Sequence, residues 1–297
     1  MYIIPSAVSD SVFRYAGMPR EGFVHSVYRN TVNIILGERL IALQSAGSPR
    51  SALSVILPAD TSEMESIAPI PGASCCVRDG LLLFESADSM PLRIPVGAPA
   101  LPESLLYPSG IPLLPERSSW IPFIRESAFG MFRNADGFAG IFREGRDDDP
   151  VLSYAGKVLD SASEALKDGD LSSASGQLCR LIGLGGGLTP SGDDFLCGML
   201  SLLYSVNAPF FDVLSEDVTA HLADTNAISA AFLDRAVQGE CSEAVRELFL
   251  TELPCSEFAA AKLRAGFEAI GHTSGMDSLC GIWYAAGLLT YAAALPG

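Results

Sequence analysis

Positively charged residues are scarce in this sequence. Its 297 residues include 19 Lys and Arg against 35 Asp and Glu, which gives a formal net charge of −16 at pH 7. A chain of that charge repels nucleic-acid phosphates and anionic lipid surfaces over roughly a Debye length, about 8 to 10 Å. We therefore expect no nucleic-acid partner and no membrane partner. Disorder is excluded as well, because hydrophobic residues make up 48% of the chain.

Signals for secretion or for a membrane span are also missing. The opening residues MYIIPSAVSD have no basic segment, no continuous apolar core and no small-residue cleavage site. The seven cysteines form no Cys-x-x-Cys pair, so a reduced, cytoplasmic protein is expected. Adjacent Cys75 and Cys76 lie on a predicted strand with one side chain buried, and neither is assigned a catalytic role. The uncharged run 280–295 is shorter than the roughly 20 residues of a spanning helix and predicts a buried core helix.

The first third of the chain predicts strands joined by tight turns. Two β-prone runs surround Gly37-Glu38, and two more surround Asp79-Gly80, as in two-residue hairpins. Prolines are dense from Pro91 to Pro122, and this density predicts that no helix forms there.

From Asp148 onward the pattern changes to a helical period. Apolar residues recur three and four positions apart in segments 151–166, 171–184, 227–237, 242–250 and 256–271. Ser242 and Ser256 are predicted N-caps. We expect an α+β protein with a β-rich N-terminal domain at 1–120, a connecting segment at 121–147 and an all-helical C-terminal domain at 148–297.

The stretch GLGGGLTPSGDD, residues 183–194, is a glycine-rich loop beside two carboxylates. No Lys follows the glycines, so it is not a P-loop, and Leu188 stands where the dinucleotide fingerprint needs glycine. Backbone exposed at a helix N-terminus, with the Thr189 and Ser191 hydroxyls beside it, is suited to binding an anion. The candidate substrate-binding residues here are Gly185, Gly186, Gly187, Thr189, Ser191, Gly192 and Asp194.

The start of this helix is repeated later in the chain. SGDDFLCG at 191–198 recurs as SGMDSLCG at 274–281. The repeat predicts two helices that begin in the same way and pack side by side. Gly198 and Gly281 would then allow the two backbones to approach closely.

Two interpretations of the repeat stay open. If Ser191 and Ser274 are N-caps, Asp194 and Asp277 fall at the N3 position of a capping box. Capping requires neither the preceding glycines nor the second carboxylate of Asp193, and those favour a ligand. We therefore count Ser274 and Asp277 among the candidate binding residues and Asp193 as a candidate catalytic residue.

A bound anion at this loop would need a positive charge from elsewhere. No Lys or Arg occurs between Leu181 and Asp234, and like charges about 4 Å apart cost on the order of 4 kcal/mol at an effective dielectric constant of 20. The candidate cations are a divalent metal, another subunit, Arg29, Arg50, Lys262 and Arg264.

Histidine is rare enough for each residue to be weighed. His272 occupies the repeat position of Thr189, where it could act as a general acid or base or as a ligand, or could hydrogen-bond the backbone at the helix start. His25, on a predicted strand, and His221, on a predicted helix, are expected to be structural or exposed. The three show no short metal-ligand spacing.

Thr225, Asn226 and Ser229 mark another helix start between the two repeats. We expect Thr225 to cap that helix. For Asn226 and Ser229, capping and a place in the binding site remain equally open.

Together these motifs resemble a bacterial family. GLGGGLTPSGDDFLCG, TNAISAAFLDRA, GHTSGMDSLCG and the N-terminal VHSVYRNTVNI are similar to the AllH-type subunit of oxamate carbamoyltransferase from anaerobic allantoin and purine degradation. The resemblance implies a subunit that acts with two other protein types and converts oxalurate and phosphate to oxamate and carbamoyl phosphate. The Ser-Thr-Arg-Thr phosphate loop of the familiar carbamoyltransferases is absent from this sequence.

Three hypotheses follow. The first is a carbamoyltransferase subunit that holds a small anion (carbamoyl phosphate, oxamate or oxalurate) at the loop, with Asp193 or His272 moving a proton. The second is a metal-dependent hydrolase or phosphotransferase in which Asp193, Asp194 and Asp277 bind Mg²⁺ or Mn²⁺; no cofactor is otherwise indicated. The third is a non-catalytic scaffold subunit in which every motif residue is a cap or a packing glycine.

Overall fold

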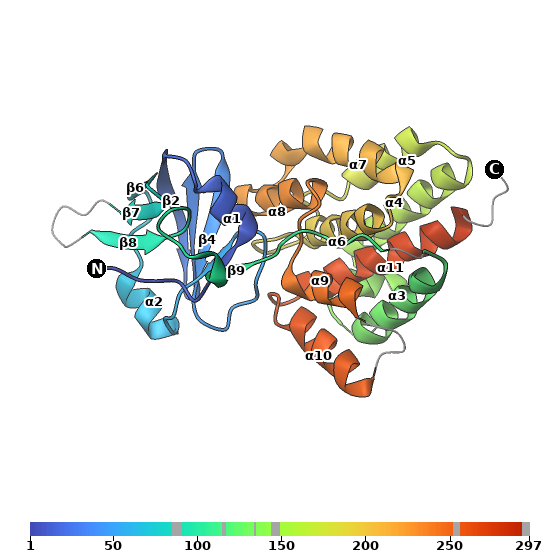
Figure 1. The fold of residues 1–297 in the computed structure, drawn as a ribbon. Coiled ribbons are helices and arrows are strands. Elements are labelled where there is room, and N and C mark those ends of the chain that lie inside the picture. The colour runs from blue at the N-terminus through green and yellow to red at the C-terminus, as the bar shows by residue number, and fades with distance from the viewer. Residues whose placement is uncertain (85–90, 115–116, 134, 144–148, 252–255, 293–297) are drawn as a thin grey trace. The chain divides into compact units, whose positions relative to one another are not determined.

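The computed structural model describes residues 1–297 except 85–90, 115–116, 134, 144–148, 252–255 and 293–297. The chain divides into two compact units, 1–109 and 110–297. The first is built mainly of strands and the second of helices, so the predicted α+β class is confirmed (Figure 1).

The first unit contains one nine-stranded sheet. Its strands are β1 (Ala7–Ser9), β2 (Arg20–Tyr28), β3 (Thr31–Leu36), β4 (Arg39–Gln44), β5 (Ser54–Ile56), β6 (Ser74–Arg78), β7 (Leu81–Phe84), β8 (Leu92–Pro95) and β9 (Leu106–Tyr107). The order in the sheet is β8-β7-β6-β2-β3-β4-β5-β1-β9. Among the strand pairs of the described residues, β4–β5 and β1–β9 are parallel and the others antiparallel. Two short helices, α1 (Asp10–Tyr15) and α2 (Thr61–Ile67), and the 3₁₀ turn η1 (Glu103–Leu105) complete the unit.

Both predicted hairpins are confirmed. β3 and β4 pair antiparallel across Gly37-Glu38, and β6 and β7 pair antiparallel across Asp79-Gly80. The turn residues Gly37, Asp79 and Gly80 have φ of 59°, 50° and 73°, which is the left-handed conformation that two-residue hairpins require. Alternation along β6 buries Cys75 and leaves Cys76 partly accessible. The six cysteines in the described part of the chain are free thiols, and Cys255 lies outside it.

The second unit is a helical domain. Its elements are α3 (Arg117–Phe132), η2 (Gly137–Phe142), α4 (Pro150–Lys167), α5 (Leu171–Cys179), α6 (Ser191–Ser205), α7 (Pro209–Ala220), η4 (Leu222–Asp224), α8 (Ala227–Val237), α9 (Glu243–Leu250), α10 (Glu257–Glu268) and α11 (Ser274–Ala292). Ser242 and Ser256 cap α9 and α10 through their side chains, as predicted. α11 packs between α6 and α3 (Figure 1).

Two features of this unit differ from the sequence-based prediction. The predicted helix at 171–184 ends at Cys179, and a turn leads from it into the glycine loop. The prediction that prolines exclude a helix up to Pro122 was wrong, because α3 includes Pro122. A proline removes one backbone hydrogen-bond donor from the helix. The packing of α3 against α11 offsets this loss.

The paired helices α6 and α11 form the centre of the domain. A Cβ added at Gly198 would lie 1.9 Å from the carbonyl oxygen of Ser278, and one at Gly281 would lie 1.9 Å from that of Phe195. Gly198 and Gly281 are 83 positions apart, and so are Phe195 and Ser278. The contact of Gly198 with Ser278 and the contact of Gly281 with Phe195 are therefore equivalent under the repeat. The two helices cross with approximate twofold symmetry. The predicted side-by-side packing is confirmed.

None of the helices in the described part of the chain is long and apolar enough to cross a membrane. The run from Cys280 is the buried part of α11, with Cys280, Ile282 and Ala285 fully enclosed.

Candidate functional site

The two Ser-Gly helix starts meet at one point in the second unit. The Oγ1 atom of Thr189, in the glycine loop, lies 2.8 Å from the Oγ atom of Ser274 at the start of α11. The residues belong to segments 85 positions apart, and the crossing of α6 and α11 brings them together. The sequence repeat thus brings the two helix starts together at one place.

The glycine loop presents free main-chain donors. Residues Gly185 to Leu188 are exposed, and the N–H groups of Gly185, Gly186 and Gly187 have no hydrogen-bond acceptor among the described residues. Gly185 and Gly187 have φ of 119° and 97°, a region open to glycine and rarely to other residues. A Cβ at Gly186 or Gly187 would meet no atom within 4 Å. Gly185 and Gly187 therefore serve backbone conformation, and there is open space beside Gly186 and Gly187.

Of the two interpretations left open by the sequence, the structure excludes capping by Ser191. Pro190 is the N-cap of α6, and its carbonyl accepts from the N–H groups of Asp193 and Asp194. Ser191 is consequently the first helical residue, and Ser274 holds the same position in α11. This shift of one residue leaves both hydroxyls free of a cap hydrogen bond.

The buried side chain of Asp193 holds the start of the glycine loop through hydrogen bonds. It is 1% exposed, its Oδ1 accepts from the N–H of Gly183 at 2.8 Å, and its Oδ2 accepts from the Thr225 hydroxyl at 2.6 Å. Burial raises the pKa of Asp193, and these hydrogen bonds oppose the rise. With both oxygens occupied, the geometry favours Asp193 as an anchor of the loop.

Asn226 is the second anchor of the loop. Its Oδ1 accepts from the N–H groups of Ile228 and Ser229, so Asn226 caps α8, and its Nδ2 donates to the carbonyl of Leu188 at 3.0 Å. The expectation that Thr225 would be the cap was wrong, because its hydroxyl is committed to Asp193. Ser229 is 1% exposed in the first turn of α8.

Asp194 and Asp277 occupy equivalent positions of the repeat, in the first turns of α6 and α11, and both are buried. They are 9% and 0% exposed, and Oδ2 of each has no hydrogen-bond partner among the described residues. Burial raises the pKa of Asp194 to about 8, with nearby Asp277 and Asp193 adding to the rise and the hydroxyls of Ser274 and Thr189 opposing it. This shift favours the protonated, neutral form of Asp194 near pH 7.

The second member of the pair is held differently. Burial raises the pKa of Asp277 to about 6, opposed mainly by the N–H of Phe138 and by the hydroxyl of Ser191. The Phe138 N–H donates to Oδ1 of Asp277 at 2.7 Å, and a Cβ at Gly137 would lie 2.4 Å from that oxygen. Each aspartate is thus stabilised by the hydroxyl of the opposite repeat: Asp194 by Ser274, Asp277 by Ser191.

The proposed sources of positive charge divide into two groups. In the second unit, Lys262 pairs with Glu247 at 3.2 Å, and Arg264 pairs with Glu268 at 2.7 Å. Arg29 and Arg50 belong to the first unit. The described residues hold no cluster of three or more His, Cys, Asp or Glu side chains suited to a metal ion. Both carboxylate oxygens of Asp193 accept hydrogen bonds from Gly183 and Thr225. The structure therefore does not support a metal site formed by the three aspartates.

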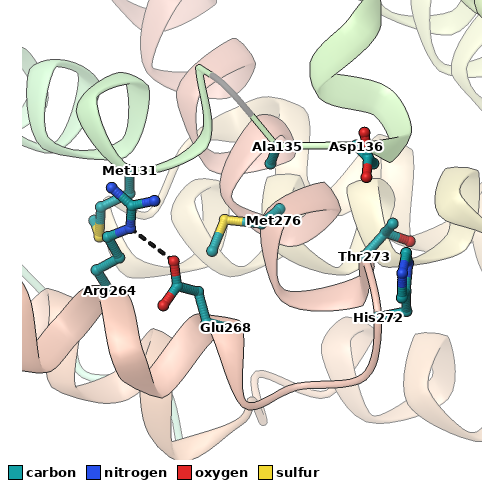
Figure 2. Close-up of a pocket in the computed structure, with 8 residues that line it drawn as sticks. All are labelled: Met131, Ala135, Asp136, Arg264, Glu268, His272, Thr273 and Met276. Atoms are coloured by element: carbon teal, nitrogen blue, oxygen red, sulfur yellow. Dashed lines mark hydrogen bonds and ion pairs between the residues drawn. The ribbon is translucent and has the colours of Figure 1, made fainter.

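A pocket of about 230 Å³ adjoins the second helix start. It is lined by Met131, Ala135, Asp136, Arg264, Glu268, His272, Thr273 and Met276 (Figure 2). His272 is exposed and faces this pocket, two residues before Ser274. The other two histidines lie outside the pocket: His25 is exposed on β2, and His221 ends α7 with Nδ1 on the carbonyl of Asp217.

Sequence reasoning missed the 135–138 segment and the pocket residues. Asp136-Gly137 is a recognisable turn signal, but nothing local connects it to Asp277, which lies 139 positions from Phe138. Arg264 was considered only as a source of charge for the loop.

Comparison with known proteins agrees with the motifs. No solved structure matches the chain. The family model described as "Oxamate carbamoyltransferase subunit AllH" matches residues 181–286, a stretch that contains both helix starts and the Asn226 segment between them. Over residues 181–286 this chain is therefore similar to the AllH subunit of oxamate carbamoyltransferase, as the sequence motifs predicted.

Proposed function

We propose that this chain is a subunit of an oxamate carbamoyltransferase complex and that its glycine loop binds the phosphate group of phosphate or carbamoyl phosphate. The supporting observation is the row of free N–H groups at Gly185–Gly187, beside the point where two helix N-termini meet. Such donors, together with the positive ends of the helix dipoles, favour a phosphate oxygen. The similarity to the AllH subunit over residues 181–286 supports this reaction class.

The protonation of the site supports an anion as well. An ionised Asp194 would repel a phosphate, but its pKa of about 8 keeps it neutral near pH 7. Both carboxylate oxygens of Asp193 accept hydrogen bonds within the protein. The charge cost foreseen from the sequence is thereby reduced at Asp194, whereas Asp277, with a pKa raised only to about 6, keeps its negative charge near pH 7.

In the proposed reaction, phosphate attacks the carbamoyl carbon of oxalurate, and oxamate leaves through its nitrogen. That nitrogen takes up one proton, and the attacking phosphate loses one, so the reaction balances. Exposed His272 and protonated Asp194 are the groups suited to this transfer. Asp193 is left to position the loop.

The loop proposal predicts that Gly187→Ala weakens phosphate binding at least about tenfold, because a side chain at φ 97° forces the loop amides to reorient. Isothermal titration with inorganic phosphate measures the effect. Gly169→Ala is the matched control: Gly169 has φ of 76° and open space around its Cβ, but lies in the turn before α5. Equal affinity in wild type and both variants would reject the loop as the phosphate site.

The subunit proposal predicts that the isolated chain forms less than about 1% of the carbamoyl phosphate that the assembled complex forms, because the remaining catalytic groups belong to partner proteins. The measurement is phosphorolysis of oxalurate by the purified chain alone and by the chain together with its co-purified partners. Full activity of the chain alone would show that it is a complete enzyme.

A further inference from the structure

Helix α3, which runs beside α11 (Figure 1), carries an aromatic and charged groove on its outward face. The groove has a volume of about 370 Å³. α3 contributes four residues to it: Pro122, Arg125, Glu126 and Phe129. The last three follow the first by three, four and seven positions, which places all four on one face of the helix. Trp283 of α11 completes the lining.

The two faces of α3 differ in chemistry. The inner face belongs to the core of the helical unit and is formed by Ile121, Ile124, Ala128 and Phe132. On the outer face, Pro122 and Glu126 are exposed, Arg125 is half-buried, and Phe129 is 41% exposed. Aromatic residues and arginine are enriched in protein interfaces, and tryptophan and arginine often carry much of the binding energy. The groove therefore has the composition of an interface.

The two charged residues of the groove lack partners of opposite charge within the described part of the chain. The Arg125 guanidinium lies over the Trp283 ring, with Cζ 5.2 Å from the ring centroid. Stacking uses the face of the guanidinium, whereas its five N–H donors lie in its plane. Neither Arg125 nor Glu126 forms an ion pair or a side-chain hydrogen bond with another described residue. A cation and an anion at adjacent positions are thus both available to a partner.

The order of the four α3 residues is self-complementary. A twofold axis makes the same surface of two copies face itself, and when the axis crosses two antiparallel helices, residues equally far from it on either side meet. With the axis between Arg125 and Glu126, Arg125 of each copy meets Glu126 of the other, and Pro122 of each meets Phe129 of the other. A parallel arrangement would instead bring Arg125 against Arg125. The charges therefore select the antiparallel arrangement.

We propose that the groove on α3 binds a second copy of this chain, with the two α3 helices antiparallel and two Arg125–Glu126 ion pairs between them. α3 has 16 residues, a length of about 24 Å. A contact of one helix pair is small for a specific interface, so we expect a weak dimer with a dissociation constant on the order of 10 µM. The contact is independent of the proposed phosphate site: Trp283 follows Ser274 by nine positions in α11, about 14 Å along the helix axis.

Sedimentation velocity of the full chain, from about tenfold below to about twentyfold above the expected dissociation constant, tests the proposal. We expect the wild type to change from monomer to dimer over this range. Arg125→Glu and Glu126→Arg should each weaken dimerisation at least about tenfold, because each converts both ion pairs into like-charge contacts. An equal mixture of the two variants should recover dimerisation as a heterodimer, since opposite charges then face each other again.

The control for net charge is Lys157→Glu. It changes the charge of the chain as much as Arg125→Glu does, but it lies on the exposed face of α4 and should leave the dimer unchanged. Arg125 and Glu126 lie outside the core, so their variants are expected to fold, which a thermal melt verifies. A wild type that stays monomeric over the whole range, a dimer that neither charge reversal weakens, or a mixture that does not recover would overturn the proposal.

Discussion

Gly281→Ala is expected to lower the free energy of unfolding by about 3 kcal/mol or more, because overpacking at a site with no room to relax displaces backbone. The added methyl group would lie 1.9 Å from the carbonyl oxygen of Phe195 and 2.9 Å from the N–H nitrogen of Met199. Both atoms belong to the backbone of α6, so no side chain can rotate away. Helices α6 and α11 must separate, and the helix starts at their N-termini separate with them.

Chemical denaturation followed by circular dichroism measures this loss. Gly198→Ala should behave alike, since its methyl group would meet the carbonyl of Ser278 at 1.9 Å. Gly176→Ala is the matched control: Gly176 lies in α5, is exposed and has no atom within 4 Å of an added Cβ. That substitution should be neutral or stabilising by up to about 1 kcal/mol, because alanine favours helix. A Gly281→Ala protein as stable as Gly176→Ala would disprove the close crossing.

The crossing is also the part of the site that the sequence predicted best. A repeated local sequence forms a repeated local structure, and glycine at matching positions of two helices indicates close backbone approach. The match of Gly198 with Gly281 therefore predicted the pairing of α6 with α11 from the sequence alone. The hairpins at Gly37 and Gly80 were predictable for a similar reason, since turn conformation depends on adjacent residues.

The position of the helix cap and the hydrogen bonds of the aspartates could not be predicted from the sequence in this way. Ser-x-x-Asp is the usual pattern of a capping box, but Pro190 supplies a carbonyl that accepts from both Asp193 and Asp194. The cap therefore moved by one residue, and the serine hydroxyls became available to the opposite repeat. Contacts such as Asp193 with Thr225 and Asp277 with Phe138 join residues 32 and 139 positions apart. They follow from tertiary packing, which no local pattern reports.

The buried carboxyl of Asp194 gives the second large expected effect, a decrease in stability as the pH rises. Its pKa is about 8 in the folded protein, against 3.8 for the ordinary side chain. The folded state thus retains a proton that the unfolded state releases. The stabilisation is complete below about pH 4 and is lost as the pH rises to about 8. At 1.36 kcal/mol per pKa unit, the loss is on the order of 5 kcal/mol across this range. Asp277, with a pKa of about 6, contributes in the same direction between about pH 4 and 6.

Asp194→Asn removes this titration while preserving the shape of the side chain. We expect the variant to lose much less stability than the wild type between pH 5 and 8 and to be the more stable protein at pH 8, in urea denaturation curves measured at each pH. Asp170→Asn is the control, because hydrogen bonds from Ser173 lower the pKa of that exposed carboxylate, so its stabilising effect is lost only in acid, below the range measured. If wild type and Asp194→Asn show the same dependence on pH, Asp194 is ionised in the folded protein. The reduced repulsion of a phosphate at the glycine loop would then have to come from a cation.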